Sequence, residues 1–267
     1  MKFDKVLIAS DFDGTLKNDD GVITSDVRDA IKYFIDNGGY FTVCTGRTYK
    51  GFQLYSDEYI NAPVLLSNGA MAYDYKDKKI IFCDGIGDEG DAPLRYIRDN
   101  FPDVSIEMYP FDKTFVINPT DITRRHLTSQ DIEMITISDP TKAKKPWAKV
   151  MLGTDSQIDS KKIQKYLREN YTDPSFLPTT GTFIELLKIG THKGSGLLKL
   201  ADYLDVQRNN VYAVGDGYND IEMLDVAKGA FVPENGSQEA IEHATHIVRS
   251  NNCGAVANVL EILDKIY

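Results

Sequence analysis

The chain has 267 residues, of which 42% are hydrophobic and 26% charged, and this balance is typical of a folded globular protein rather than a disordered one. The formal net charge of −10 makes the mean electrostatic field repel polyanions, so we expect no nucleic-acid partner. The three cysteines are far apart and argue against a disulfide framework. A reducing cytoplasm therefore fits best. No apolar run reaches the ~18 residues that a membrane-spanning helix needs, so we expect no membrane partner.

Strands and helices are expected to alternate along the first part of the chain. The apolar run 6–9 predicts a strand buried on both faces, and it ends at Asp11. Apolar residues at helical spacing over 27–35 predict a helix that returns across the sheet. Residues 40–44 and 64–66 predict the next two strands, so a strand–helix–strand order is established.

This order is interrupted by a mixed region. Alternating apolar and polar residues over 70–82 predict a hairpin, and the elements that follow up to about residue 188 are short. Helices are expected near 92–100 and 158–170, and strands near 105–109, 115–118, 134–138, 148–152 and 183–187.

The first pattern then resumes, with a helix near 194–204, a strand at 211–214 and a last helix ending near Tyr267. We therefore predict an α/β fold. A Rossmann-like parallel-sheet core is expected over residues 1–83 and 188–267, with an α+β domain inserted over 84–187.

Four polar clusters follow a predicted strand or begin a predicted helix. They are DFDGTL at 11–16, TGR at 45–47, THKG at 191–194 and GDGYND at 215–220. Ligands of open parallel sheets sit outside the carboxyl ends of the strands, so we expect these clusters to converge. Two carboxylates about 4 Å apart repel by roughly 4 kcal/mol at an effective dielectric of 20, which calls for a cation. Oxygen-only ligands favour Mg²⁺.

Taken in this order, DFDGTL, TGR, HKG and GDGYND resemble the four motifs of the haloacid dehalogenase superfamily. The large insertion, with SNGA at 67–70, resembles the Cof-type sugar-phosphatase branch, and so does the stretch around Asn235, Asn252 and Gly254. The DxD start is similar to that of the phosphatases and not to that of the dehalogenases. The resemblance implies a magnesium-dependent phosphatase with a cap domain, acting on small phosphorylated metabolites such as sugar phosphates through an aspartyl-phosphate.

The resemblance also implies a role for each motif residue. Asp11 would attack phosphorus, and Asp13 would protonate the leaving oxygen and later activate water. The phosphoryl group would be bound by Thr45, Gly46 and Lys193. The metal ion would be held by Asp11, the backbone carbonyl of Asp13 and Asp216, with Asn219 and Asp220 supporting them.

Two further residues, Arg47 and Glu185, have both a functional and a structural reading, and two others are expected to be structural. Arg47 either contacts substrate or pairs with an acid beside the site. Glu185 resembles a position near the domain junction of related phosphatases, but an edge-strand glutamate that faces water fits equally well. His192 is expected to shape its loop, and Trp147, the sole tryptophan, is expected in the core.

Two other functions share these motifs. A sugar phosphomutase would transfer the phosphoryl group to another position of a sugar, and product analysis separates it from a hydrolase. A catalytically silent sensor of phosphometabolites would need neither a nucleophile nor an acid, so the presence of Asp11 and Asp13 argues against it. The motifs lie outside the insert, which is therefore expected to select the leaving group.

Overall fold

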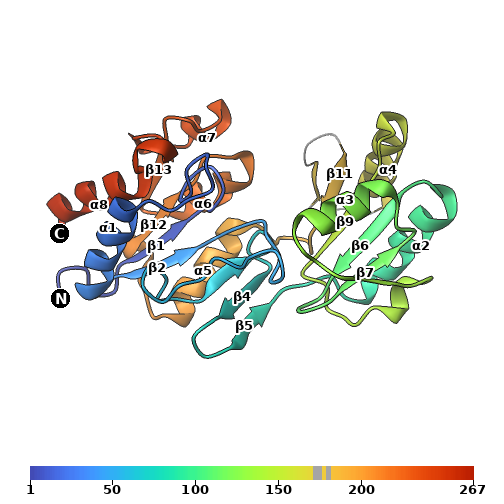
Figure 1. The fold of residues 1–267 in the computed structure, drawn as a ribbon, viewed down its shortest axis with the longest axis horizontal. Coiled ribbons are helices and arrows are strands. Elements are labelled where there is room, and N and C mark those ends of the chain that lie inside the picture. The colour runs from blue at the N-terminus through green and yellow to red at the C-terminus, as the bar shows by residue number, and fades with distance from the viewer. Residues whose placement is uncertain (171–175, 179–181) are drawn as a thin grey trace. The chain divides into compact units, whose positions relative to one another are not determined.

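The computed structural model describes residues 1–170, 176–178 and 182–267, which fall into two units of dense internal packing (Figure 1). The core unit consists of Met1–Gly46, Leu54–Phe82 and His192–Tyr267. The cap unit consists of Arg47–Gln53 and Cys83–Thr191. The predicted insert thus lies within the cap unit, and the short segment Arg47–Gln53, which the sequence placed with the core, is grouped with it.

Five parallel strands form the main sheet of the core unit, in the order β14-β13-β12-β1-β2. Their bounds are β1 Leu7–Ser10, β2 Tyr40–Val43, β12 Val211–Val214, β13 Gly229–Pro233 and β14 His246–Val248. In the register, Ile8 of β1 lies opposite Phe41 and Tyr212. The predicted parallel sheet, built from both ends of the chain, is confirmed.

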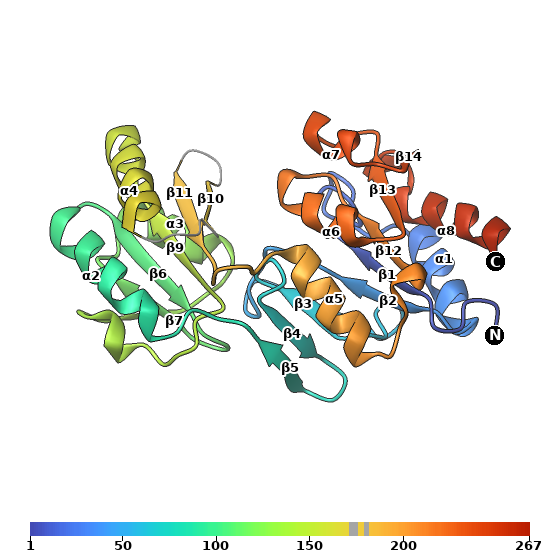
Figure 2. The ribbon, with the colours of Figure 1, turned by 180° about the vertical axis from the view of Figure 1, so that it is seen from behind.

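Helices cover both faces of this sheet, which explains the continuous apolar runs of its central strands. On one face, Leu7 and Ala9 pack with Leu197 and Leu200 of α5. The helices α1 and α8 lie side by side in both views (Figures 1 and 2). The helix bounds are α1 Ser25–Asp36, α5 Lys193–Tyr203, α6 Ile221–Val226, α7 Gln238–Glu242 and α8 Ala255–Ile266.

A three-stranded sheet, in the order β3-β4-β5, extends the core unit, with β3 at Val64–Leu66, β4 at Met71–Asp74 and β5 at Lys79–Cys83. A parallel bridge between Cys44 and Leu65 places β3 beside the end of β2. The turn between β3 and β4 contains Ser67 and Asn68 at φ of 51° and 53°. The predicted hairpin over 70–82 is confirmed.

The cap unit contains a six-stranded sheet in the order β10-β11-β9-β6-β7-β8, antiparallel except between β7 and β8. The helices α2 and α4 pack on one face, around the fully buried Trp147, and α3 packs on the other. The bounds are α2 Asp91–Asn100, β6 Ser105–Tyr109, β7 Thr114–Ile117, α3 Asp121–Ser129, β8 Met134–Thr136, β9 Lys149–Gly153, α4 Gln157–Asn170, β10 Phe176–Pro178 and β11 Phe183–Leu186.

Short 3-10 helices lie at Asp88–Gly90, Pro140–Lys142, Arg208–Asn210, Tyr218–Asp220 and Asn251–Cys253. None of the helices in the described ranges combines the length and the apolar composition that a membrane span requires.

Two expectations for the cap unit differ from the structure. The helix α3 was not predicted, because its only apolar residues, Ile122 and Leu127, are five apart and show no helical periodicity. The reading of Glu185 as a water-facing glutamate on an edge strand is wrong. Its strand β11 lies between β10 and β9, and Glu185 is only 3% exposed.

Candidate active site

The first motif begins where β1 ends. The buried Asp11 directly follows this strand, and its backbone N–H donates to the carbonyl of Val214, at 2.7 Å. Val214 is the last residue of the neighbouring parallel strand β12, so Asp216 comes two residues after the same edge of the sheet. The register of β1 and β12 therefore brings the first and last motifs together.

Lys193 connects these two motifs through its side chain. It is the first residue of α5 and is fully buried. Its Nζ donates to Asp11 Oδ1 at 2.5 Å and to Asp220 Oδ1 at 2.6 Å. His192 caps the helix, because its Nδ1 accepts from the N–H of Ser195, whose Oγ in turn accepts from the N–H of His192. The expectation that His192 shapes its loop is confirmed.

The loop after β12 holds its two aspartates in different ways. Asp220 Oδ2 accepts from the N–H groups of Asp216 and Gly217, at 3.0 and 2.9 Å, so both of its carboxylate oxygens have donors. Asp216 Oδ1 accepts from Thr15 Oγ1 at 2.5 Å. Gly14 has φ +86°, and a Cβ there would lie 2.7 Å from Asp216 Oδ2. Only glycine fits this close approach.

The carboxylates of Asp11, Asp216 and Asp220 offer oxygen atoms that lie within 4.8 Å of one another. When all three are ionised, the single charge of Lys193 leaves a net charge of −2, which a divalent cation would balance. The donors are all oxygens, which suits a hard ion such as Mg²⁺. The acidic cluster therefore has the charge and the donor atoms that a metal site needs.

Burial shapes the protonation of this cluster. Burial raises the pKa of Asp11 to about 8, against the opposing effect of Lys193 and with a further upward contribution from Asp220. Burial likewise raises the pKa of Asp216. Burial disfavours the charged form of Lys193, but the two carboxylates beside it outweigh that effect and raise its pKa. A bound cation would favour the ionised carboxylates.

Asp13 differs from Asp11 in its surroundings. Its side chain is 50% exposed and lies 3.3 Å from Lys17 Nζ, and its carboxylate is not part of the acidic cluster. An exposed carboxyl near the buried Asp11 can exchange protons with water, as a general acid and base must.

The second motif lies at the end of β2. Thr45 is buried, its N–H donates to the carbonyl of Leu65, and its own carbonyl accepts from the N–H of Asn68. Asn68 Oδ1 accepts from Asn219 Nδ2 at 3.0 Å and lies 3.2 Å from the position that a Cβ on Gly46 would take. Asn68 therefore joins the second motif to the fourth.

Sequence reasoning assigned no site role to Thr15, Asn68 or Asn235, which position the motif loops. Asn235 Nδ2 donates to the carbonyl of Gly14 at 2.8 Å, and its Oδ1 accepts from the N–H of Asn251. Thr15 lies within DFDGTL and Asn68 within SNGA, so the motif around each residue could have indicated a role at the site. Their partners could not be read from the sequence.

The remaining candidates, Arg47 and Glu185, belong to the cap unit. Arg47 Nη1 donates to the carbonyl of Gly51 at 3.0 Å. Glu185 Oε2 accepts from Lys149 Nζ at 3.1 Å in a buried ion pair.

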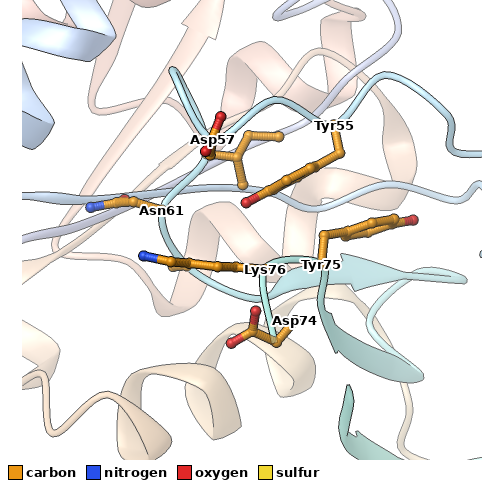
Figure 3. A pocket seen from close by; sticks show the side chains of 8 residues that line it. Tyr55, Asp57, Asn61, Asp74, Tyr75 and Lys76 are labelled. Atoms are coloured by element: carbon orange, nitrogen blue, oxygen red, sulfur yellow. The ribbon is translucent and has the colours of Figure 1, made fainter. Parts of the chain in front are cut away.

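A separate small pocket of about 90 Å³ lies in the core unit (Figure 3). Tyr55 and Tyr75 line it, and their rings stack at 4.9 Å between centroids. None of the four motifs contributes a residue to its lining, so it is not the predicted phosphate site.

Comparison with known proteins identifies the family of this chain. Residues 8–260 match the family model of the haloacid dehalogenase-like hydrolases. The chain belongs to this family. It is 28% identical over 280 residues to the 5-amino-6-(5-phospho-D-ribitylamino)uracil phosphatase YwtE of Bacillus subtilis, covering 96% of this chain and 97% of the relative.

Solved structures share the fold across both units. A haloacid dehalogenase-like hydrolase from Bacteroides thetaiotaomicron matches with a TM-score of 0.81 at 23% identity, covering 98% of this chain and 99% of the other. The subclass IIB sugar phosphatase BT4131 matches with a TM-score of 0.82 at 16% identity, covering 97% and 99%. The protein is thus a phosphatase of the haloacid dehalogenase superfamily, of the Cof type, and the prediction of an enzyme of this class is confirmed.

Proposed function

We propose that this phosphatase hydrolyses phosphate monoesters of small metabolites of the sugar-phosphate class, with Asp11 as nucleophile and Mg²⁺ as its metal ion. The observation that supports this most is the position of Lys193. Its buried ammonium lies between the carboxylates of Asp11 and Asp220, beside the end of β1. A fixed cation next to a nucleophilic carboxylate can hold the transferring phosphoryl oxygens.

The proposed reaction has two displacements at phosphorus. In the first, a carboxylate oxygen of Asp11 forms a bond to phosphorus while the bond to the ester oxygen breaks, and Asp13 gives its proton to that oxygen. In the second, Asp13 takes a proton from water, the water oxygen bonds to phosphorus, and the bond to Asp11 breaks. Inorganic phosphate leaves, and both aspartates return to their starting states.

The other motif residues would bind and orient the phosphoryl group. Thr45 and Gly46 would offer neutral donors to its oxygens, and Lys193 would offer charge. Asp11, the carbonyl of Asp13 and Asp216 would hold Mg²⁺, while Asn219 and Asp220 keep the loop in place. The ion would shield the nucleophile's charge and stabilise charge on the transferring oxygens.

The substrate class is supported by two comparisons. The name of the relative YwtE describes a phosphate on a ribityl chain, and BT4131 is named a sugar phosphatase. Both leaving groups are polyhydroxylated carbon chains. We therefore place hexose, pentose and polyol phosphates ahead of nucleotides and phosphoproteins, with the cap unit selecting among them.

The test is a panel of phosphate esters that includes hexose, pentose and ribityl phosphates, with free phosphate as the readout. Release of phosphate supports a hydrolase, whereas an isomeric sugar phosphate as product would identify a mutase. Tight binding of a phosphorylated ligand without any turnover would point to a sensor. Chelation should stop activity reversibly, and full activity in protein shown by elemental analysis to lack metal would reject the Mg²⁺ site.

A further inference from the structure

The segment Arg47–Gln53 directly follows the proposed phosphate-binding turn Thr45-Gly46. The turn belongs to the core unit, and the segment belongs to the cap unit. A single peptide bond, between Gly46 and Arg47, therefore joins a phosphate-binding turn to a piece of chain that packs with the cap. The chain also passes between the units at 53/54, 82/83 and 191/192.

Two contacts anchor this segment within the cap unit. The ring of Tyr49 lies against that of Phe111, with 4.3 Å between centroids and 33° between planes. Gly51 is buried, and a Cβ there would lie 2.7 Å from Gln130 Oε1, so the Gln130 amide rests directly on its backbone. Phe111 follows β6 and Gln130 follows α3, so the two contacts reach different elements of the cap unit.

The segment itself is a tight turn. Arg47 Nη1 donates to the carbonyl of Gly51 at 3.0 Å, and the N–H of Gly51 donates to Thr48 Oγ1 at 3.2 Å. The N–H of Phe52 donates to the carbonyl of Thr48 at 2.9 Å. These hydrogen bonds connect residues 47–52 within one turn. We therefore expect a displacement of Tyr49 or Gly51 to move Arg47 as well.

A chain of hydrogen-bonding side chains, half-buried at Gln130 and His126 and buried at Glu107, holds the Gln130 amide in place. Gln130 Nε2 lies 2.8 Å from His126 Nε2, and His126 Nδ1 lies 3.0 Å from Glu107 Oε2. The hydroxyl of Tyr109 donates to the same Glu107 oxygen, and Glu107 is fully buried on β6. These hydrogen bonds fix the position of the Gln130 amide, which lies against the backbone of Gly51.

We propose that four positioning residues couple the cap unit to the phosphate-binding turn. They form two contacts, Tyr49 with Phe111 and Gly51 with Gln130. Phosphate bound at Thr45-Gly46 raises the affinity of the cap unit for the leaving group through this segment. A leaving group bound by the cap unit raises the affinity of the turn for phosphate by the same factor. Binding energy from the non-reacting part of the substrate is thereby used at phosphorus. The inference rests on the proposed function, because it takes Thr45 and Gly46 as phosphate ligands.

Tyr49→Ala tests this coupling. Its matched control is Tyr55→Ala, which removes an equally half-buried ring that stacks on Tyr75 within the core unit. For Tyr49→Ala we expect kcat/KM to fall about tenfold for glucose 6-phosphate and less than about twofold for acetyl phosphate, whose leaving group is too small to engage the cap. This factor lies in the usual range of about 5–150-fold for coupled sites. Tyr49→Phe, which keeps the ring contact, should restore the wild-type ratio.

A second readout does not depend on turnover. Amide hydrogen exchange is measured with and without inorganic phosphate and Mg²⁺. In the wild type, phosphate should slow exchange in residues 47–53 and also in the cap residues 107–113. In Tyr49→Ala, or in Phe111→Leu if that variant folds better, the slowing should stop at Gly46.

Three outcomes would overturn the coupling. They are an unchanged exchange pattern in Tyr49→Ala, an equal loss for both substrates, or the same effects in Tyr55→Ala. Failure of the proposed function looks different. In that case the wild type releases no phosphate from any ester, while the exchange experiment still shows whether phosphate bound to the core unit reaches the cap.

Discussion

The Nζ of Lys193 lies 2.5 Å from Asp11 Oδ1, although the two residues are 182 positions apart in the sequence. The lysine is fully buried and has no contact with water, and in the metal-free protein below about pH 8, where Asp11 keeps its proton, the carboxylate of Asp220 balances its charge. Breaking a buried ion pair from one side leaves a charge without a partner, which typically costs about 3–5 kcal/mol.

Lys193→Met should therefore lower both stability and activity. We expect a loss of about 3–5 kcal/mol in the free energy of unfolding of the metal-free protein, measured by urea denaturation. Turnover should fall by at least about 10²-fold, because a charge-stabilising donor at the phosphoryl group is lost. The control is Lys265→Met, which replaces an exposed lysine of α8 in the same unit and should change stability by less than about 0.5 kcal/mol. Equal unfolding curves for the two variants would contradict the assigned role.

Asp11→Asn should abolish phosphate release while the protein stays folded, because the amide has the shape of the carboxylate but cannot attack phosphorus. Asp13→Asn should slow turnover by about 10²–10⁴-fold, the usual cost of losing a general acid–base group. Acid quenching with radiolabelled substrate should trap phosphate on the wild type and none on Asp11→Asn. Near-normal turnover by Asp11→Asn would falsify the covalent route.

The raised pKa of Asp11 predicts how the stability of the metal-free protein depends on pH. The folded state holds a proton on Asp11 up to about pH 8, whereas the unfolded chain releases it near the ordinary value of 3.8. This contribution to stability is complete below pH 3.8 and is lost as the pH rises toward 8. Thermal melts in a chelator should show this decline, and Asp11→Asn should show a shallower one. Mg²⁺ should raise the melting temperature most at the upper end of the range. Parallel melting profiles for the two proteins would reject this explanation.

A substitution in the buried ion pair Lys149–Glu185 can test whether the cap unit selects the substrate. Glu185→Gln removes the charge of the carboxylate but keeps the size of the side chain, so it weakens the ion pair with Lys149. We expect this variant to change the order of kcat/KM among hexose, pentose and polyol phosphates. Substitutions in the core unit such as Asp220→Asn should lower kcat/KM for all substrates by a similar factor. Glu169→Gln, on the exposed face of α4, is the control, because its side chain is 60% exposed. An unchanged ranking in Glu185→Gln, together with a reordered ranking in a core variant, would show that the core selects the substrate.

The layout of the core and the order of its motifs could be predicted from the amino-acid pattern alone. Continuous apolar runs such as 6–9 and 211–214 arise because both faces of a central parallel strand are covered, and the structure places β1 and β12 there. Motifs that follow such strands must meet at one edge of the sheet. For this reason Asp11 and Asp216 could be assigned to one site before any distance was known.

Which side chains pair became visible only in the folded protein. The short polar α3 has no helical periodicity of its own and is held by packing against the cap sheet. Nothing local to Asp220 indicates that its two oxygens divide between Lys193 and the backbone of its own loop. Residues 47–53 likewise read as a continuation of the core, until Tyr49 is seen against Phe111. Hydrophobic periodicity records whether a position is buried, but which distant residue fills the neighbouring space depends on the packing of the whole chain.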